Sequence, residues 1–541
     1  MSEQGSGGLA ATHALKSLGV THVFTLTGGH IFPIFDGCVK DEIKLVDMRH
    51  EQTAVFAAEG WARLTRKLGV AAVTAGPGVT NAMSPIAQAS FNSAPVLVLA
   101  GRAPSFRWGQ GSLQEMDHPP FVAPVAEAST VQAIEDVSGE VMRAALRALT
   151  PPRGPQFLDF PLDVLFNMTD LELPAHIDHV GPATVDPGDV EKVASLLAVS
   201  ERPIFIAGSN VWLDGAEGAL RQLAEAAELP VFMNGQGRGC IPADHRLAFS
   251  RARSAGMKGA DLVIVAGTPM DFRLGFGQNF ASGTKVVHID SDSELIANHV
   301  DLTASIGAPL NESLAALAQA VSGAPPTRKE WIAQLMEVEK SKRDGVEAEL
   351  RSGSDPIHPM RVYGELVPLL DRDAVVIGDG GDFVSYAGRE VPSYEPGCWL
   401  DPGPFGCLGV GPGYAMAARL AHPDRQVVVM YGDGALGFSG MELETLVRLK
   451  LPVVCVVGNN GIWGLEKHPM RGLYGYDVVA DLRPGIRYDQ VMEAFGGKGE
   501  LVTDPDELGA AFRRAFDSGE PYLVNVLTDP SIAYPRSANL A

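Results

Sequence analysis

The segment from Gly432 to Asn460 carries side chains suited to bind a metal ion together with a phosphate group. Asp433 stands between two glycines directly after the apolar run QVVVMY, and Asn460 stands just after the apolar run PVVCVVG. If these runs are parallel strands joined by one helix, the carboxylate and the amide oxygen converge at one edge of a sheet. Such oxygen ligands suit Mg²⁺ that also binds phosphate oxygens. The neighbouring glycines let the backbone approach a diphosphate closely.

A second acidic side chain, Glu51, comes shortly after the apolar run IKLV and near the start of a predicted helix at 53–68. A glycine-rich loop at 76–81 follows the next apolar run. A carboxylate at the start of a helix is also favourable for electrostatic reasons alone. The residue types therefore leave open whether Glu51 takes part in catalysis or only stabilises a helix.

The elements that must position these side chains follow an alternating pattern. Short β-branched runs alternate with helical patterns in three successive groups, which favours parallel sheets covered by helices. A stretch rich in proline and aspartate at 170–189 has no periodicity and indicates a linker. We therefore predict an α/β fold of three doubly wound parallel-sheet domains at 1–170, 188–325 and 355–541, the last ending in a C-terminal tail.

Composition excludes several classes of function. The chain has 541 residues and a formal net charge of −22, which disfavours binding to nucleic acid or to an anionic membrane surface. Its five cysteines are widely spaced and form no CxxC motif, so neither a disulfide framework nor a zinc site is indicated. We find neither a secretory signal nor an apolar run of about 20 residues, and we expect a cytoplasmic protein without a membrane anchor.

The GDG and NNG segments together resemble the diphosphate-binding signature of the thiamine-diphosphate enzymes, and the resemblance covers nearly the whole chain. It implies thiamine diphosphate and Mg²⁺ as cofactors. The metal ligands would be the side chains of Asp433 and Asn460 and the carbonyl of Ile462. The three predicted domains would be the pyrimidine-binding domain, a central nucleotide-binding-like domain and the diphosphate-binding domain of that family.

The same resemblance implies roles for further residues. Glu51 would protonate the pyrimidine nitrogen, so that the 4-amino group becomes an imine able to take the proton from the thiazolium carbon. Leu408 would lie beneath the cofactor and force its bent conformation. Because the family builds each site from two chains, a homo-oligomer is implied, with a dimer of dimers, a homotetramer, as our expectation. The remaining cofactor-binding candidates are Pro77, Asn81, Asp382, Gly432, Gly434, Ala435 and Trp463.

The substrate must be read from other loops, and four side chains bear on it: His30, Gln114, Trp463 and Glu493. The segments NNGIWGLEKHP and YDQVMEAFGGKGELV resemble the acyl-CoA branch of the family. We therefore expect a 2-hydroxyacyl-CoA lyase, which splits a small acyl-CoA substrate into formyl-CoA and an aldehyde or ketone. His30, Gln114 and Glu493 are candidates for its proton transfers, although each also has a plain structural interpretation.

Three alternatives stay open: an acetolactate synthase acting on pyruvate, an oxalyl-CoA decarboxylase, and a non-catalytic subunit with the same fold. Related acetolactate synthases bind FAD in the central domain, whereas the acyl-CoA branch binds ADP there. We expect ADP, or FAD if the chain is a synthase. A central domain without any nucleotide is the other possibility. The candidate nucleotide-binding residues are Arg153, Gly208, Ser209, Arg273 and Asp290.

Overall fold

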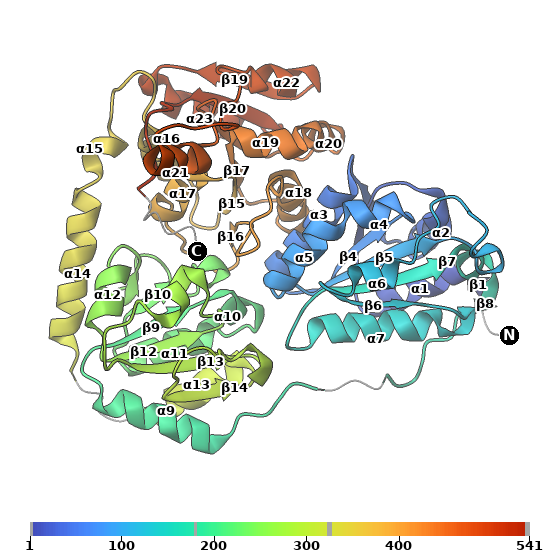
Figure 1. The fold of residues 1–541 in the computed structure, drawn as a ribbon, viewed down its shortest axis with the longest axis horizontal. Helices are drawn as coiled ribbons and strands as arrows, with labels where there is room; N and C mark the ends of the chain where they lie inside the picture. The colour runs from blue at the N-terminus through green and yellow to red at the C-terminus, as the bar shows by residue number, and fades with distance from the viewer. Residues whose placement is uncertain (1–3, 178–180, 322–326, 536–541) are drawn as a thin grey trace. The chain divides into compact units, whose positions relative to one another are not determined.

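The computed structural model describes residues 4–177, 181–321 and 327–535 (Figure 1). The chain forms three six-stranded sheets, and every strand pairing within them is parallel. The prediction of three parallel-sheet α/β domains is therefore confirmed. Within the described part of the chain, no helix is long and apolar enough to cross a membrane.

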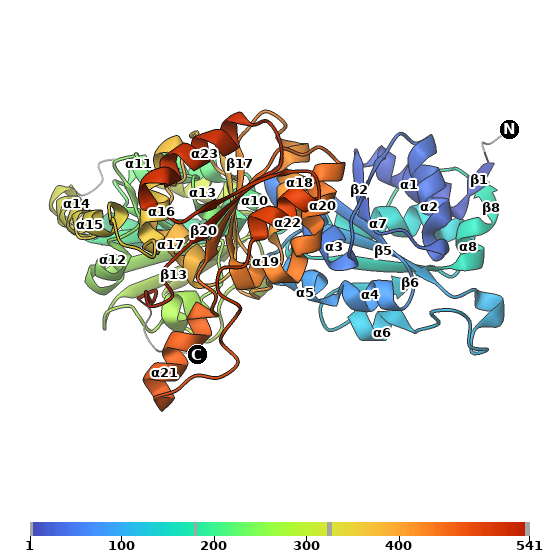
Figure 2. The same cartoon turned by 90° about the horizontal axis from the view of Figure 1, so that it is seen from above.

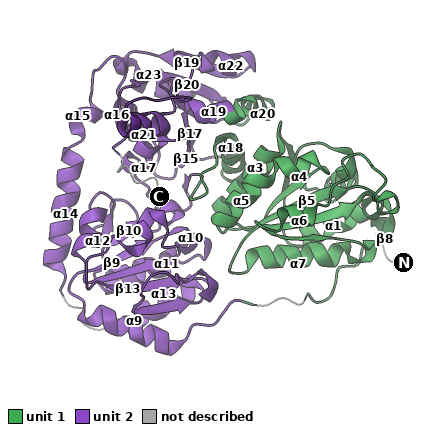
Figure 3. Ribbon diagram, in the orientation of Figure 1, with its two compact units in different colours: residues 1–181, 402–423, 438–451 green, residues 182–401, 424–437, 452–541 purple. Residues whose placement is uncertain are grey.

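The chain divides into two compact units (Figure 3). The first contains one six-stranded sheet and the second contains the other two. Two segments of the predicted third domain, 402–423 and 438–451, belong to unit 1. The boundaries of the three domains stay predictions. Unit 1 comprises residues 1–181, 402–423 and 438–451, and unit 2 comprises residues 182–401, 424–437 and 452–541.

The sheet of unit 1 is built from short runs of valine, leucine and alanine. Its central strands are entirely buried, which explains why their sequences are apolar without alternation. A separate antiparallel pair is formed by β1 (Gln4–Ser6), which precedes the strands of this sheet in the sequence, and β8 (Met168–Asp170), which follows them. The sheet order is β3 (Lys44–Asp47), β2 (His22–Thr25), β4 (Gly69–Val73), β5 (Val96–Arg102), β7 (Gln156–Pro161) and β6 (Glu127–Thr130).

Helices cover both faces of this sheet, as its doubly wound order requires. They are α1 (Gly7–Ser17), α2 (Phe32–Lys40), α3 (Glu51–Thr65), α4 (Pro77–Asn81), α5 (Met83–Phe91), α6 (His118–Val122), α7 (Val137–Leu149), α8 (Leu162–Phe166), α18 (Gly411–Ala421) and α20 (Leu443–Arg448). One layer contains α1, α2 and α7, and another contains α3 packed on α5 and α18. The first layer shares a buried apolar core with the sheet.

Unit 2 contains two sheets, each with its own apolar core. The central sheet has the order β11 (Ala248–Phe249), β10 (Val231–Met233), β9 (Pro203–Ala207), β12 (Leu262–Ala266), β13 (Lys285–Asp290) and β14 (Ala304–Gly307). The other sheet has the order β16 (Trp399–Leu400), β15 (Val375–Asp379), β17 (Val427–Gly432), β18 (Val454–Asn459), β20 (Tyr522–Leu527) and β19 (Lys498–Val502).

The helices of unit 2 pack around these two sheets, except that α21 projects from the rest of the unit (Figure 2). The boundary between the two units falls inside α19 (Asp433–Ser439). The helices are α9 (Pro187–Val199), α10 (Ser209–Leu213), α11 (Glu217–Ala226), α12 (Arg253–Gly259), α13 (Leu310–Ala320), α14 (Lys329–Asp344), α15 (Glu347–Leu350), α16 (Pro359–Leu366), α17 (Asp382–Glu390), α21 (Gly464–Tyr474), α22 (Tyr488–Ala494) and α23 (Leu508–Asp517).

Candidate cofactor and substrate site

In unit 2, the two predicted metal ligands follow neighbouring strands. β17 pairs in parallel with β18, with Gly432 opposite Gly458, so the chain leaves both strands at the same edge. Asp433 begins α19, and Asn460 comes directly after β18. The valine-rich runs form strands because β-branched side chains fit a buried, pleated surface. The expected convergence of the two side chains follows from this pairing.

The Asp433 carboxylate is held by the backbone of both loops. It accepts hydrogen bonds from the backbone N–H of Gly434 at 3.0 Å and from that of Gly461 at 2.8 Å. Burial raises the pKa of Asp433 to about 6, and the nearby Asp382 carboxylate acts in the same direction. A bound cation would favour the charged form of this carboxylate. The position of Asp433 therefore suits a metal ligand.

Asn460 links this carboxylate loop to a third strand end. Its amide donates to the Asp382 carboxylate at 3.3 Å, and its side-chain oxygen accepts from the Ile462 N–H at 3.2 Å. Asp382 begins α17 after β15, the strand on the other side of β17. Burial raises the pKa of Asp382 as well. Three polar side chains thus meet at the carboxyl ends of three adjacent strands.

Two observations at this edge fit the expected diphosphate. The buried Nε2 atom of His468 has no hydrogen-bond partner, and this histidine interacts electrostatically with Asp382. A β-carbon on Gly434 would lie 2.5 Å from the indole ring of Trp463, so only glycine fits there. In residues 4–177, 181–321 and 327–535, no three histidine, cysteine, aspartate or glutamate side chains form a metal cluster. The predicted Mg²⁺ ligands are of another kind: one carboxylate from Asp433, one amide oxygen from Asn460 and the backbone carbonyl of Ile462.

In unit 1, Glu51 is the first residue of α3 and is only 6% exposed. Asn81, at the end of α4, donates a side-chain hydrogen bond to its carboxylate at 3.0 Å. Gly78 lies against the same carboxylate, because a β-carbon there would be 3.6 Å from the other carboxylate oxygen. The glycine-rich loop at 76–81 therefore holds Glu51 in place.

His30, Thr74 and Gln114 form a chain of polar contacts beside this loop. The Thr74 hydroxyl lies 3.3 Å from Nδ1 of His30 and donates to the side-chain oxygen of Gln114 at 3.4 Å. Burial lowers the pKa of His30, whereas a hydrogen bond to the backbone of Leu113 opposes this shift. A neutral imidazole can donate one hydrogen bond and accept another. The structure thus brings the predicted residues His30 and Gln114 together.

A buried triad that sequence reasoning missed supports this cluster. The Gly76 N–H donates to Nε2 of His118 at 3.0 Å, so the ring proton is on Nδ1, which lies 2.8 Å from the Asp159 carboxylate. Arg102 donates to the same carboxylate at 2.9 Å and stacks on the ring of Trp108. These contacts fix the start of the glycine-rich loop.

Leu408 lies in unit 1, in the loop before α18, and is partly exposed. The following Gly409 has φ +86°, and a β-carbon there would lie 2.8 Å from Phe438 and 3.4 Å from the Gln52 amide. The Leu408 loop therefore packs near the first turn of α3. Its role beneath a cofactor stays a prediction.

The remaining cofactor and catalytic candidates have varied surroundings. Gly432 and Ala435 are buried, whereas Pro77 is exposed at the start of α4. Trp463 immediately precedes α21. Glu493 is exposed on α22 and interacts electrostatically with Arg487. Glu493 belongs to unit 2, and its catalytic role stays a prediction.

The candidate nucleotide-binding residues are divided between the units. Gly208, Ser209, Arg273 and Asp290 belong to unit 2, and Arg153 belongs to unit 1. Asp290 is 1% exposed and accepts hydrogen bonds from the Asn210 amide at 2.9 Å and the Ser291 N–H at 2.8 Å. Arg273 is paired with Asp271 at 2.8 Å. These side chains are thus engaged within the protein.

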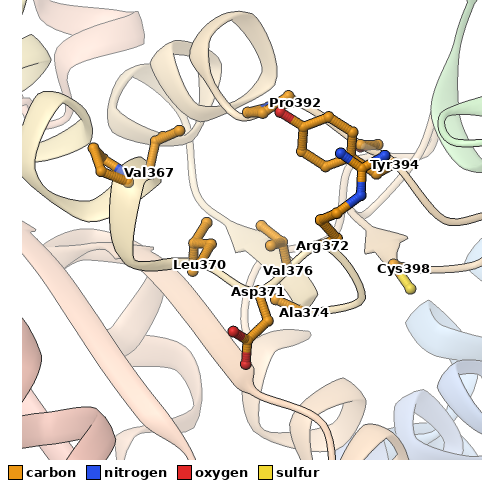
Figure 4. Close-up of a pocket in the computed structure, with 11 residues that line it drawn as sticks. Val367, Leu370, Asp371, Arg372, Ala374, Val376, Pro392, Tyr394 and Cys398 are labelled. Carbon is orange, nitrogen blue, oxygen red and sulfur yellow. The ribbon is translucent and has the colours of Figure 1, made fainter. Parts of the chain in front are cut away.

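A separate pocket lies at the amino end of β15 (Figure 4). Its lining includes Val376, near the start of that strand, whereas Asp382 follows the strand's other end. Its arginine, Arg372, pairs with Asp244 at 2.9 Å. Burial raises the pKa of its cysteine, Cys398, to about 11. The pocket is distinct from the polar edge that carries Asp433.

Comparison with known protein families gives three adjacent matches. Residues 6–121 match the thiamine pyrophosphate enzyme N-terminal TPP binding domain, and residues 379–526 match the C-terminal TPP binding domain. Residues 190–317 match the central domain of the same enzymes. The chain belongs to the thiamine pyrophosphate enzyme family. The resemblance seen in the sequence is therefore confirmed, and thiamine diphosphate (thiamine pyrophosphate) is its cofactor.

Relatives within this family extend over nearly the whole chain. The acetolactate synthase large subunit IlvG of Mycobacterium tuberculosis is 54% identical over 530 residues, covering 97% of this chain and 96% of the relative. The probable acetolactate synthase of Mycobacterium bovis has the same identity and coverage. The 2-hydroxyacyl-CoA lyase 2 of Danio rerio is 32% identical over 573 residues, covering 96% of this chain and 91% of the relative.

Proposed function

We propose that this thiamine-diphosphate-dependent enzyme is a carboligase of the acetolactate synthase type. The observation that carries the proposal is the 54% identity to two mycobacterial proteins named as acetolactate synthases, over 97% of the chain. The lyase that we expected first is named in relatives of much lower identity, such as the 32% identical zebrafish protein. The comparisons therefore favour the alternative over our first expectation.

The proposed reaction joins two molecules of a 2-oxo acid. One pyruvate loses carbon dioxide, and its remaining two-carbon fragment forms a carbon–carbon bond with the carbonyl carbon of a second pyruvate. Two pyruvate ions and one proton give one acetolactate ion and one carbon dioxide. When bound, thiamine diphosphate supplies the carbanion and the electron sink that this chemistry needs.

The protein's own residues bind, orient and exchange protons. Glu51 would share a proton with the pyrimidine nitrogen of the bound cofactor, and Asn81 holds the carboxylate in position through its 3.0 Å hydrogen bond. Asp433 and Asn460 would bind Mg²⁺ through their side chains, and Ile462 would do so through its carbonyl. The unpartnered Nε2 of His468 is available to a phosphate oxygen.

The cluster of His30, Thr74 and Gln114 is proposed to bind the substrate oxygens. Burial lowers the pKa of His30, which favours its neutral form and lets it hydrogen-bond a carbonyl oxygen without a fixed positive charge. Gln114 has φ +58°, an uncommon conformation for a residue other than glycine, and lies against Gly76. The backbone thus holds its amide beside the loop that supports Glu51.

The synthase proposal carries two further expectations, FAD in the central domain and a homo-oligomer. Both rest on the family resemblance. A purified protein with the yellow absorption of flavin would support the first expectation. Sedimentation at several protein concentrations would test the second, with a dimer or a dimer of dimers as the expected species.

A second candidate, the 2-hydroxyacyl-CoA lyase, is favoured by relatives of that name that match 96% of the chain. A lyase would act in the direction of bond cleavage and release formyl-CoA from an acyl-CoA. The polar cluster around His30 could serve either reaction, since both need a hydrogen-bond donor beside a carbonyl oxygen.

The experiment that separates these functions compares substrates on one enzyme preparation. The purified protein, loaded with thiamine diphosphate, Mg²⁺ and FAD, receives pyruvate, a 2-hydroxyacyl-CoA or oxalyl-CoA, and acetolactate, formyl-CoA and carbon dioxide are quantified. We expect acetolactate from pyruvate. Formyl-CoA from the 2-hydroxyacyl-CoA, without acetolactate from pyruvate, would overturn the proposal in favour of the lyase. The E51Q variant is the control for product formed without the enzyme's chemistry.

A further inference from the structure

Glu442 is a buried carboxylate that the sequence does not connect with any chemistry. It ends a 3₁₀ turn, η8 (Gly440–Glu442), directly before α20, and it is 2% exposed. This turn lies in unit 1, the same compact unit as Glu51. A buried carboxylate is costly unless several donors surround it, so its contacts indicate what it does.

Within the part of the chain that the structure describes, the hydrogen-bond partners of Glu442 are donors: Thr445 lies on α20, and the others lie around the start of α3. The Arg49 N–H donates to its two oxygens at 3.0 and 3.2 Å, and the Thr445 hydroxyl donates at 2.7 Å. The backbone of His50 and the side chain of Thr53 complete the set. Two consecutive backbone N–H groups before Glu51 are thus bound by a residue far away in the sequence.

We propose that Glu442 is a positioning residue that sets the orientation of the Glu51 carboxylate toward the cofactor. The proposal rests on the proposed role of Glu51 in cofactor activation. Helix starts leave backbone N–H groups without partners inside the helix. Here His50 caps the Gln52 N–H at 3.1 Å, and Glu442 binds the N–H groups of Arg49 and His50. Glu51 therefore lies between backbone N–H groups that are held on both sides of it.

The charge of Glu442 is essential to this arrangement, because every partner presents a proton to it. Burial raises the pKa of Glu442, and the surrounding donors offset only part of this rise. The charged groups nearby form exposed pairs: Arg49 with Glu444 at 3.5 Å, and Arg448 with Asp47 at 2.9 Å. Exposed pairs of this kind contribute little. Glu444 therefore offers a matched control on the same segment.

The test compares the E442Q and E444Q variants with the unaltered enzyme. An amide at 442 keeps one acceptor oxygen but turns an NH₂ group toward donors, so the turn before Glu51 shifts. For E442Q we expect kcat to fall at least about tenfold, because small displacements of a catalytic group have large effects on rate. We expect KM to change little and E444Q to resemble the unaltered enzyme.

A second readout needs thiamine diphosphate and Mg²⁺ but no substrate. The near-ultraviolet circular dichroism of the bound aminopyrimidine reports its protonation and tautomer, which Glu51 is proposed to control. We expect its pH midpoint to move in E442Q and E51Q and to stay unchanged in E444Q. A fall in thermal stability without any move of this midpoint would overturn the proposal, because it would show a purely structural role.

Two further outcomes are decisive. If E442Q does not fold, the Thr445→Val variant removes one donor and keeps the carboxylate, and it should move the midpoint in the same direction by a smaller amount; no movement would overturn the proposal. A midpoint that does not respond to E51Q would overturn the role of Glu51 and this inference together. A failed pyruvate assay with a responsive midpoint would overturn only the proposed substrate.

Discussion

Asn81 donates its side-chain amide to the carboxylate of Glu51 at 3.0 Å, and this hydrogen bond joins the end of α4 to the start of α3. Asn81 ends the short helix α4, which begins a few residues after β4 and directly after Gly76, a glycine with φ +59°. The contact orients the carboxylate of a residue that is only 6% exposed. It is the most direct structural support for an acid–base role of Glu51.

We predict that Glu51→Gln lowers kcat by about 10²- to 10⁴-fold, the usual effect of removing a positioned acid–base group. The amide is similar in size and can still contact Asn81, so folding and thiamine diphosphate affinity should change little. Stopped assays and isothermal titration measure the two effects. The control is Thr80→Ala, which removes a hydroxyl that donates to the Pro77 carbonyl in the same short helix. Full activity in E51Q would contradict the proposed activation.

A second prediction concerns the glycine after Asp433. Gly434→Ala places a methyl group 2.5 Å from the Trp463 ring, so the ring or the loop must move. We expect thiamine diphosphate affinity in the presence of Mg²⁺ to fall about tenfold or more, because an unrelieved contact costs about 1–3 kcal/mol. Titration with the cofactor, followed by tryptophan fluorescence, measures this change.

Gly437→Ala is the matched control, because it lies in the same helix and a β-carbon there meets no atom within 4 Å. The control should bind the cofactor like the unaltered protein. Equal affinities in both variants would mean that the Gly434 loop does not approach the diphosphate.

The third prediction tests the buried triad beneath the glycine-rich loop. Asp159→Asn leaves Arg102 without its buried partner and disturbs the Nδ1–H bond of His118. We expect the unfolding free energy of this domain to fall by about 3–5 kcal/mol, as for other broken buried pairs. Urea unfolding followed by circular dichroism measures it. The Asp117→Asn variant removes an exposed partner of the same arginine and should cost at most about 1 kcal/mol.

The sequence predicts well those features that depend on neighbouring strands. Asp433 and Asn460 each follow an apolar run, and the parallel pairing of these runs is enough to bring the two together. The runs around Glu51 likewise identify β3 and α3, although α3 begins two residues before the predicted helix. Local patterns therefore determine the cofactor edge and its surroundings.

Contacts between residues far apart in the sequence could not be predicted in this way. Glu442 contacts Arg49, and Arg102 contacts Asp159, across long separations in the sequence that no local pattern encodes. The single helix expected between the two apolar runs is divided into α19 and α20 by the turn at Gly440–Glu442, from which Glu442 contacts the start of α3. The choice of substrate depends on long-range contacts of this kind. The sequence therefore predicts the cofactor correctly, but it favours the lyase where the comparisons favour the synthase.

The fourth prediction uses the buried carboxylate of the central sheet. Burial raises the pKa of Asp290 to about 7, above its ordinary value of 3.8, whereas the Asn210 amide opposes the shift. A folded-state pKa above the unfolded value means that the folded protein binds the proton more tightly. Ionisation of Asp290 therefore destabilises the folded protein progressively as pH rises from about 4 to about 7, and the full penalty is present above that range.

Asp290→Asn removes this titration and keeps an acceptor oxygen for the Asn210 amide and the Ser291 N–H. The variant should therefore gain stability relative to the unaltered protein when pH is raised from 5 to 8. Urea midpoints of both proteins, measured without nucleotide at several pH values, give the difference directly. The control is Asp292→Asn in the same loop, where the partly exposed Asp292 side chain accepts a hydrogen bond from the Glu294 N–H; this variant should show no such trend. A constant difference between D290N and the unaltered protein across this pH range would mean that Asp290 is already ionised at pH 5 in the folded protein.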